Sequence, residues 1–295
     1  MGQNFVLCGI LYWGMVEICD FGLFVYGCMP QVKLIMIVVV LVMGWGMALK
    51  ARRPERGEKV FAWDDKVFAR GNGMPEARYL ALGDSYTIGE SVDPEERYPV
   101  QLWRMLADND HLVCGDPEII AVTGWTTGDL LEALSAVRPG AVDGSVKPQA
   151  ANGSVRPGAS YDMVSLLIGV NNQYQGRSQT EYRGQFGLLL QKCIALAGNR
   201  PDRVVVVSIP DYSVTLFARA RGLDTTLIAA QIDSFNRINF ELAGAYKVNY
   251  IDVTAESRKA AADASLIAAD GLHFSGKEYR MWARLMEPVF KGRLQ

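Results

Sequence analysis

The sequence predicts an α/β fold, in which a five-stranded parallel sheet lies between two layers of helices in a three-layer, flavodoxin-like arrangement. Two observations lead to this prediction. From residue 77 onward, short apolar segments alternate with longer amphipathic ones, which is the pattern of strands that alternate with crossover helices. Three of the short segments are also nearly continuous in Val, Ile and Leu, as expected for strands that helices cover on both faces.

Each short apolar segment is an expected strand, and the stretch between two of them is long enough for a helix. In chain order the strands are expected at Arg78–Gly83, Glu118–Val122, Met163–Ile168, Arg203–Ile209 and Val248–Val253. The helices are expected at Tyr98–Asn109, Gly128–Ala136, Thr180–Gly198, Thr226–Ala245 and Gly276–Lys291. Right-handed crossovers join such units into one sheet, and the pattern requires no second folded domain.

The first fifty residues are more apolar than the rest and form a separate hydrophobic segment, 1–50. Within it, the 16 residues Leu34–Leu49 carry no charge. As a helix they would cover about 24 Å, which is short of the roughly 30 Å of a bilayer core but suits the hydrophobic region of a signal peptide. Upstream, Glu17 and Asp20 interrupt the apolar stretch, and an Asp at mid-membrane costs about 3 kcal/mol.

Three interpretations of this segment stay open: a signal peptide, a membrane anchor, or translation that starts at Met29 or Met36. The first two predict a protein that is exported or membrane-associated, and the third predicts a cytoplasmic one. In a membrane hairpin, the basic residues that follow the segment would keep the folded domain on the cytoplasmic side. Residues 51–76 are then a polar linker, and residues 77–295 are the folded domain.

Residues 136–160 interrupt the alternation of strands and helices. They hold a nine-residue tandem repeat, AVRPGAVDG, SVKPQAANG and SVRPGAS. Because Pro, Gly and small residues dominate it, we expect a flexible surface insertion between a helix and the third strand. The alternative is an arm that binds a partner.

The composition excludes several classes of protein. The formal net charge of the 295-residue chain is −2, whereas a protein that coats DNA or RNA would have an excess of basic residues. The chain has 2 histidines and 5 cysteines, and no two cysteines form a CxxC pair. A structural zinc site or a disulfide-rich scaffold is therefore not expected. The two cysteines of the folded domain, Cys114 and Cys193, are predicted to be buried apolar side chains.

Polar residues follow the expected strands at the edge of the sheet where parallel sheets bind ligands. The segments are Gly83–Thr87 after the first strand, Thr123–Thr126 after the second, Gly169–Asn172 after the third, and Asp270–Ser275 ahead of the last helix.

These segments contain the residue types of a serine hydrolase. The hydroxyl of Ser85 is a poor nucleophile unless a base removes its proton, and His273 is the natural base. Asp270 can accept a hydrogen bond from one ring nitrogen of His273 and so fix its tautomer. The backbone N–H groups of Ser85 and Gly124 and the side-chain amide of Asn171 can stabilise the oxyanion.

Simpler roles for the same residues stay open. Ser85 could be a helix cap, with Asp84 beside it ordering the loop. Asn171 could be a turn residue, and Asp270 begins a common turn pair. The other histidine, His111, lies at an expected helix end, where a solvated side chain is the simpler interpretation.

Together the four segments resemble the SGNH (GDSL-type) hydrolase family, over roughly residues 77–293. That family has a Ser in a GDS motif, a Gly, an Asn in GxND, and a DxxH pair. The matching residues here, in the same order, are Ser85, Gly124, Asn171, Asp270 and His273.

Two residues depart from the family pattern. Asn172 stands where many members have Asp, and Phe274 where many have Pro. Neither occupies a position to which the resemblance assigns a catalytic role.

The resemblance implies a serine esterase that hydrolyses carboxylic esters through an acyl-serine intermediate, without a metal or other cofactor. It is nearest to the lysophospholipase-like esterases. The expected partner is a small-molecule ester, such as a short acyl ester, a lysophospholipid or an acetylated sugar. The alternatives are a carbohydrate O-acetylesterase or acyltransferase with the same triad, or a non-catalytic binding protein of the same fold.

Aromatic and amide residues near these segments are candidates for binding the substrate: Tyr86, Trp125, Gln173, Tyr174 and Tyr212. Residues 210–217, after the fourth strand, are expected to form a wall or lid of the pocket. The same aromatic side chains could instead be part of the core.

Overall fold

A computed structural model describes residues 76–110, 115–136 and 160–294. The hydrophobic segment 1–50, residues 51–75 of the linker, His111, Cys114 and residues 137–159 of the insertion lie outside the described residues, so the expectations for them stay predictions. Among the described helices, none combines the length and the apolar composition that crossing a membrane requires.

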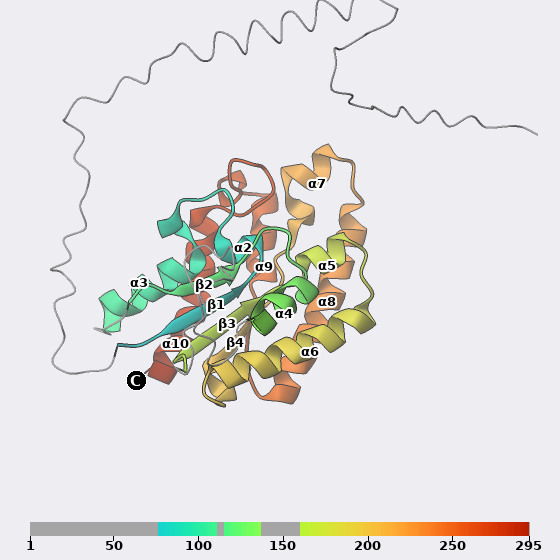
Figure 1. Ribbon diagram of the computed structural model, residues 1–295. Helices are drawn as coiled ribbons and strands as arrows, with labels where there is room; N and C mark the ends of the chain where they lie inside the picture. The colour runs from blue at the N-terminus through green and yellow to red at the C-terminus, as the bar shows by residue number, and fades with distance from the viewer. Residues whose placement is uncertain (1–75, 111–114, 137–159, 295) are drawn as a thin grey trace, which may run out of the picture. The chain divides into compact units, whose positions relative to one another are not determined.

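The centre of the fold is a sheet of five parallel strands in the order β2-β1-β3-β4-β5 (Figure 1). This is the flavodoxin-like strand order, and it confirms the predicted fold class. The strands are β1 (Tyr79–Gly83), β2 (Glu118–Ala121), β3 (Met163–Leu167), β4 (Val204–Val207) and β5 (Asn249–Ile251).

The central strands are the most apolar because helices cover both of their faces. Every residue of β1, β3 and β4 is buried, whereas the residues of the edge strand β5 are only partly buried. β1 ends at Gly83 as expected, whereas the other four strands end one or two residues earlier than expected. After β4, the N–H of Ile209 donates to Asn236 Oδ1 at 2.8 Å, and its carbonyl accepts from Asn236 Nδ2 at 2.9 Å.

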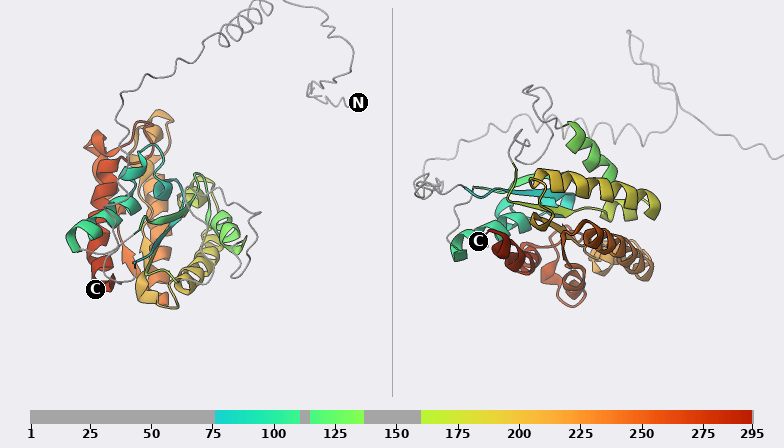
Figure 2. Two further views of the ribbon diagram at one scale, coloured as in Figure 1. Left: turned by 60° about the vertical axis from the view of Figure 1, so that its left-hand side comes forward. Right: turned by 90° about the horizontal axis from the view of Figure 1, so that it is seen from below.

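Within the described residues, five long helices flank the sheet, and each corresponds to a predicted one. They are α3 (Tyr98–Asp110), α4 (Thr127–Ala136), α6 (Gln179–Leu196), α8 (Thr225–Tyr246) and α10 (Gly276–Leu294). Figure 2 shows α3 and α10 together on one side of the sheet and α4 and α6 on the other. Cys193 on α6 is fully buried, as predicted.

Four short α-helices in the described part of the chain were not predicted. They are α2 (Ser85–Ile88), α5 (Val170–Tyr174), α7 (Leu216–Ala220) and α9 (Thr254–Ser257). A helix of one turn is too short to show a 3.6-residue hydrophobic period. Three of them, α2, α5 and α9, begin within three residues of the ends of β1, β3 and β5.

Glu278 on α10 is a fully buried carboxyl group that makes stability depend on pH. Its Oε1 accepts from Trp282 Nε1 at 2.7 Å, and its Oε2 has no hydrogen-bond partner within the described part of the chain. Burial raises the pKa of Glu278 from 4.5 to about 7, against the hydrogen bond from Trp282.

We expect the native protein to become less stable as pH rises from about 4.5 to about 7, and we expect this decrease to be absent in Glu278→Gln. In that window the folded state holds a proton that the unfolded state has released, so the free energy of unfolding falls as pH rises. The slope from one such group is at most about 1.4 kcal/mol per pH unit. Urea unfolding at pH 5 and pH 7.5 measures it, with Glu132→Gln on the exposed face of α4 as the control. If the free energies of unfolding of the native protein and Glu278→Gln differed by the same amount at pH 5 and pH 7.5, this role of Glu278 would be contradicted.

Candidate active site

Ser85 lies in a tight turn between β1 and α2. Asp84 is the N-cap of α2, and its Oδ1 accepts from the backbone N–H of Tyr86 at 3.1 Å. Asp84 is completely buried, and its burial raises its pKa to about 7, against hydrogen bonds from backbone groups that include those of Tyr86 and Gly169. Asp84 therefore orders the turn, while Ser85, the first residue of the helix, faces the cavity described below.

Two glycines allow close packing at the ends of β1 and β3. A Cβ on Gly83 would lie 2.1 Å from Oγ1 of Thr87 and 2.3 Å from the carbonyl oxygen of Leu167. Gly169 has a φ of +131°, and a Cβ there would lie 2.5 Å from the hydroxyl of Tyr182. Because a Cβ at either position would contact these atoms too closely, only glycine fits.

Asp270 and His273 form a closely bonded pair in the loop before α10. The distance between His273 Nδ1 and Asp270 Oδ2 is 2.6 Å. Ser91 Oγ donates to the same carboxylate oxygen at 2.7 Å, and the backbone N–H groups of Leu272 and His273 donate to Oδ1, each at 2.9 Å. Burial opposes ionisation, but the hydrogen bonds from His273, Leu272 and Ser91 outweigh it and lower the pKa of Asp270 to about 2.

The ionised carboxylate sets the tautomer of His273. A carboxylate can only accept a hydrogen bond, so Nδ1 of the ring must donate. The neutral ring then keeps an unprotonated Nε2, which is the form that can act as a base. His273 is largely buried, and its ring meets the ring of Tyr86 edge-on with the centroids 5.7 Å apart.

Gly124 and Asn171 are held side by side at the ends of β2 and β3. Asn171 Nδ2 donates to the carbonyl oxygen of Trp125 at 2.9 Å, which uses one of the two N–H groups of that amide. Gly124 has a φ of +87°, and an added Cβ would meet nothing within 4 Å. Glycine is therefore required at 124 by the backbone conformation and not by crowding.

Asn172, which departs from the family pattern, fastens the end of β3 to the start of α4. Its Oδ1 accepts from the N–H of Thr127 at 3.0 Å, and its Nδ2 donates to Thr127 Oγ1 at 2.8 Å. That hydroxyl in turn donates to Gln185 Oε1. An amide supplies both the acceptor and the donor that this arrangement needs, whereas an ionised Asp would supply only acceptors.

Ser85, Gly124, Asn171 and His273 line one cavity of about 310 Å³. This volume is near the lower end of the range of about 300–1,000 Å³ that is typical of ligand pockets. The cavity lies at the carboxyl ends of the strands, where the sequence predicted the site. Its lining residues are Ser85, Tyr86, Thr123, Gly124, Val170, Asn171, Tyr174, Tyr212, Phe217, Arg221, Leu272 and His273. Asp270 stands behind His273, on the Nδ1 side of the ring.

The predicted substrate-binding residues divide into two groups. Tyr86, Tyr174 and Tyr212 line the cavity. Trp125 and Gln173 are not among its lining residues. The ring of Trp125 packs against the core, and Gln173 donates to Gln231 of α8 at 2.7 Å.

Ser91 and Arg221 carry no signal in the sequence, whereas Phe217 and Thr123 lie in segments that the sequence places at the site. Ser91 is 179 positions from the carboxylate that it contacts, and an exposed serine in a loop is unremarkable by itself. Phe217 lies within the expected wall 210–217, but Arg221 lies four residues beyond it. Thr123, which donates to Glu90 Oε2 at 2.5 Å, reaches the cavity from the end of β2.

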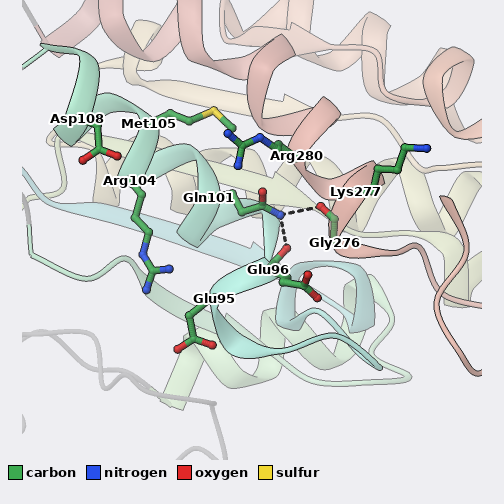
Figure 3. A pocket seen from close by; sticks show the side chains of 9 residues that line it. All are labelled: Glu95, Glu96, Gln101, Arg104, Met105, Asp108, Gly276, Lys277 and Arg280. Carbon is green, nitrogen blue, oxygen red and sulfur yellow. Dashed lines mark hydrogen bonds between the residues drawn. The ribbon is translucent and has the colours of Figure 1, made fainter. Parts of the chain in front are cut away.

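A second cavity, of about 530 Å³, lies between α3 and α10 and contains none of the predicted site residues. Figure 3 shows acidic and basic side chains around it, with Gln101 donating to the carbonyl oxygens of Glu96 and Gly276 at 2.6 and 2.8 Å. It is lined by Glu95, Glu96, Gln101, Arg104, Met105, Asp108, Gly276, Lys277 and Arg280. This lining has no hydroxyl nucleophile and no histidine, so the smaller cavity is the better candidate.

A metal site is not apparent in residues 76–110, 115–136 and 160–294, where no group of three or more His, Cys, Asp or Glu side chains could hold an ion.

A protein-family model covers most of the folded domain. The model of the GDSL-like lipase/acylhydrolase family matches residues 81–281, a range that contains Ser85, Gly124, Asn171, Asp270 and His273. No curated protein matches the sequence.

Several solved structures share the fold. A lipase, Lip_vut3, from a goat rumen metagenome is 17% identical, with a TM-score of 0.54, and the match covers 74% of this chain and 100% of that one. A lipase/acylhydrolase from Enterococcus faecalis is 22% identical, with a TM-score of 0.50 and coverage of 74% and 97%. An acetylxylan esterase, Axe2, from Geobacillus stearothermophilus is 18% identical, with a TM-score of 0.51 and coverage of 72% and 94%.

Proposed function

The chain belongs to the GDSL-like lipase/acylhydrolase family of ester hydrolases, and we propose on that basis that it cleaves carboxylic esters through an acyl-Ser85 intermediate. One observation carries the proposal. Ser85 and His273 line the same cavity, and Asp270 holds His273 by a 2.6 Å contact to Nδ1 that directs Nε2 away from the carboxylate.

In the first half of the reaction, Ser85 Oγ attacks the ester carbonyl carbon while His273 Nε2 accepts the hydroxyl proton. The tetrahedral intermediate collapses when the bond to the alcohol oxygen breaks, and His273 returns its proton to the departing alcohol. Such proton transfer contributes roughly 10²- to 10⁴-fold to the rate.

In the second half, a water molecule attacks the acyl-Ser85 ester and gives its proton to His273. Breakage of the bond to Oγ, to which His273 returns the proton, then releases the carboxylic acid and regenerates the serine hydroxyl, so each cycle consumes one ester and one water. In both halves the negative oxygen is stabilised by the N–H groups of Ser85 and Gly124 and by the second N–H of Asn171. Each such donor is worth roughly 10²- to 10³-fold in kcat.

The cavity favours an ester with one acyl chain of short to medium length. Its volume is small, and the rings of Tyr174, Tyr212 and Phe217 form an aromatic wall, with the ring of Tyr174 6.3 Å from that of Tyr212 and 6.5 Å from that of Phe217. Val170 and Leu272 add apolar surface to the same cavity. A single acyl chain can lie against such a wall.

For 4-nitrophenyl esters we expect kcat/KM to rise from acetate to butanoate or hexanoate and then to fall for longer chains. Each buried CH₂ contributes about 0.8 kcal/mol, or about fourfold, until the cavity is full. Initial rates with the full-length protein measure the profile, and the release of nitrophenol without enzyme is the control. A maximum at acetate, together with release of acetate from acetylated xylan, would favour the carbohydrate O-acetylesterase alternative instead.

A further inference from the structure

Arg221 gives the candidate active site a permanent positive charge. Among the described residues that line the cavity, it is the only one with a side chain charged at every working pH. It follows α7 as the C-cap of that helix, and its side chain is exposed. An exposed cation in the wall of a catalytic cavity can contact the part of a substrate that extends beyond the scissile bond.

The guanidinium is held in place by packing and not by an opposite charge. Its carbon lies 4.3 Å from the centroid of the Phe217 ring. Phe217 is itself fixed to the catalytic loop, because its N–H donates to the carbonyl oxygen of Gly271 at 2.9 Å. Stacking on an aromatic ring leaves the N–H groups of an arginine free to bind a ligand and lowers the entropy lost on binding.

No protein carboxylate neutralises this charge in the described part of the chain. None lies within 4.0 Å of the Arg221 guanidinium. Two carboxylates, one close to Arg221 in sequence and one in the loop that Phe217 contacts, both have other partners. Asp224 caps α8 by accepting from the N–H of Leu227 at 2.9 Å, and Asp270 is bonded to His273 and Ser91.

We propose that Arg221 makes this site select esters that carry an anionic group, a carboxylate or a phosphate, beyond the scissile bond. The proposal deepens the esterase function and rests on it. The planar guanidinium suits both anions, since it can donate two parallel N–H bonds to either. At an exposed site, an attraction of this kind weakens as salt increases.

The experiment compares matched esters in the full-length protein. For a carboxylate on the acyl side, the pair is the mono-4-nitrophenyl ester of glutarate and neutral 4-nitrophenyl hexanoate. For a phosphate on the alcohol side, the pair is 4-acetoxyphenyl phosphate and neutral 4-acetoxybenzamide. The measured quantity is the ratio of kcat/KM for the anionic ester to that for its neutral partner. The two arms also decide which anion is preferred.

We expect this ratio to fall about tenfold in Arg221→Gln in at least one arm, and to recover in part in Arg221→Lys. Arg219→Gln is the matched control, because Arg219 carries the same charge on the same exposed helix but does not line the cavity. It should leave the ratio unchanged. A ratio equal in native protein and Arg221→Gln in both arms, or an equal fall in Arg219→Gln, would overturn the proposal.

A binding measurement separates this inference from the esterase function. Calorimetry with butyl phosphate requires no turnover, and we expect the native protein to bind it at least fivefold more tightly than Arg221→Gln does. If none of the esters is hydrolysed but this difference is found, the esterase function fails and the anion site stands. Equal affinity of the two proteins for butyl phosphate would count against the anion site even if the neutral esters are hydrolysed.

Discussion

Replacement of Ser85 by Ala is expected to lower kcat for 4-nitrophenyl butanoate by about 10⁴-fold or more. The variant lacks the oxygen that forms the acyl-enzyme, and neither His273 nor the oxyanion donors can replace it. Removal of one hydroxyl from the start of α2 leaves the N-cap bond from Tyr86 to Asp84 intact, so the fold should be retained. Steady-state rates and circular dichroism on the same samples measure both quantities.

Ser135→Ala is the matched control for that variant. The hydroxyl of Ser135 lies on the exposed face of α4 and donates only to the carbonyl oxygen of Leu131 in its own helix. Its loss should change kcat less than twofold. If Ser85→Ala remained folded and kept more than a tenth of the native kcat, Ser85 would not be the nucleophile.

Replacement of Asp270 by Asn is expected to lower kcat by about 10³- to 10⁴-fold. The carboxylate accepts four hydrogen bonds, from the His273 ring, two backbone N–H groups and Ser91. An amide cannot accept all four, and its NH₂ group favours the tautomer in which Nδ1 of His273 accepts. The proton then lies on Nε2, and the ring is no longer a base toward Ser85.

Ser91→Ala separates the orientation of the carboxylate from its charge. This variant removes one of the four hydrogen bonds and leaves the ionised carboxylate beside His273, so we expect a decrease in kcat of no more than about tenfold. A folded Asp270→Asn protein with kcat within tenfold of native would show that the pair has no role in orienting the base. An equal decrease in kcat in Asp270→Asn and Ser91→Ala would also contradict this role of the carboxylate. The negative charge would then contribute nothing beyond the hydrogen bond from Ser91.

The layers of the fold could be predicted because their signal is local and repeated. Runs such as Val204–Val207 identify buried strands, and the long helices other than α6 carry a hydrophobic period. The short helices α2 and α5 could not be predicted, because one turn shows no period and their formation depends on the strand ends that they follow. The end of β4 is set by the contact with Asn236, which lies 27 residues away.

The residues placed at strand ends could likewise be predicted, because a parallel sheet brings those ends to one edge. Ser85, Gly124 and Asn171 line one cavity on that account, and His273 reaches the same cavity from the loop before α10. What sequence could not provide is the orientation of individual side chains. Gln173 is only two residues from Asn171, yet it turns to α8 and bonds with Gln231, and Arg221 reaches the cavity by stacking on Phe217.

The most direct test of the acyl-Ser85 mechanism is to identify the residue that becomes covalently bound. Full-length native protein and Ser85→Ala are treated with a fluorophosphonate probe, and the labelled peptide is identified by mass spectrometry. We predict one label, on Ser85 in the native protein, and none in the variant. A label on any other residue, or hydrolysis of 4-nitrophenyl butanoate by a protein whose Ser85 stays unlabelled, would contradict the acyl-Ser85 mechanism.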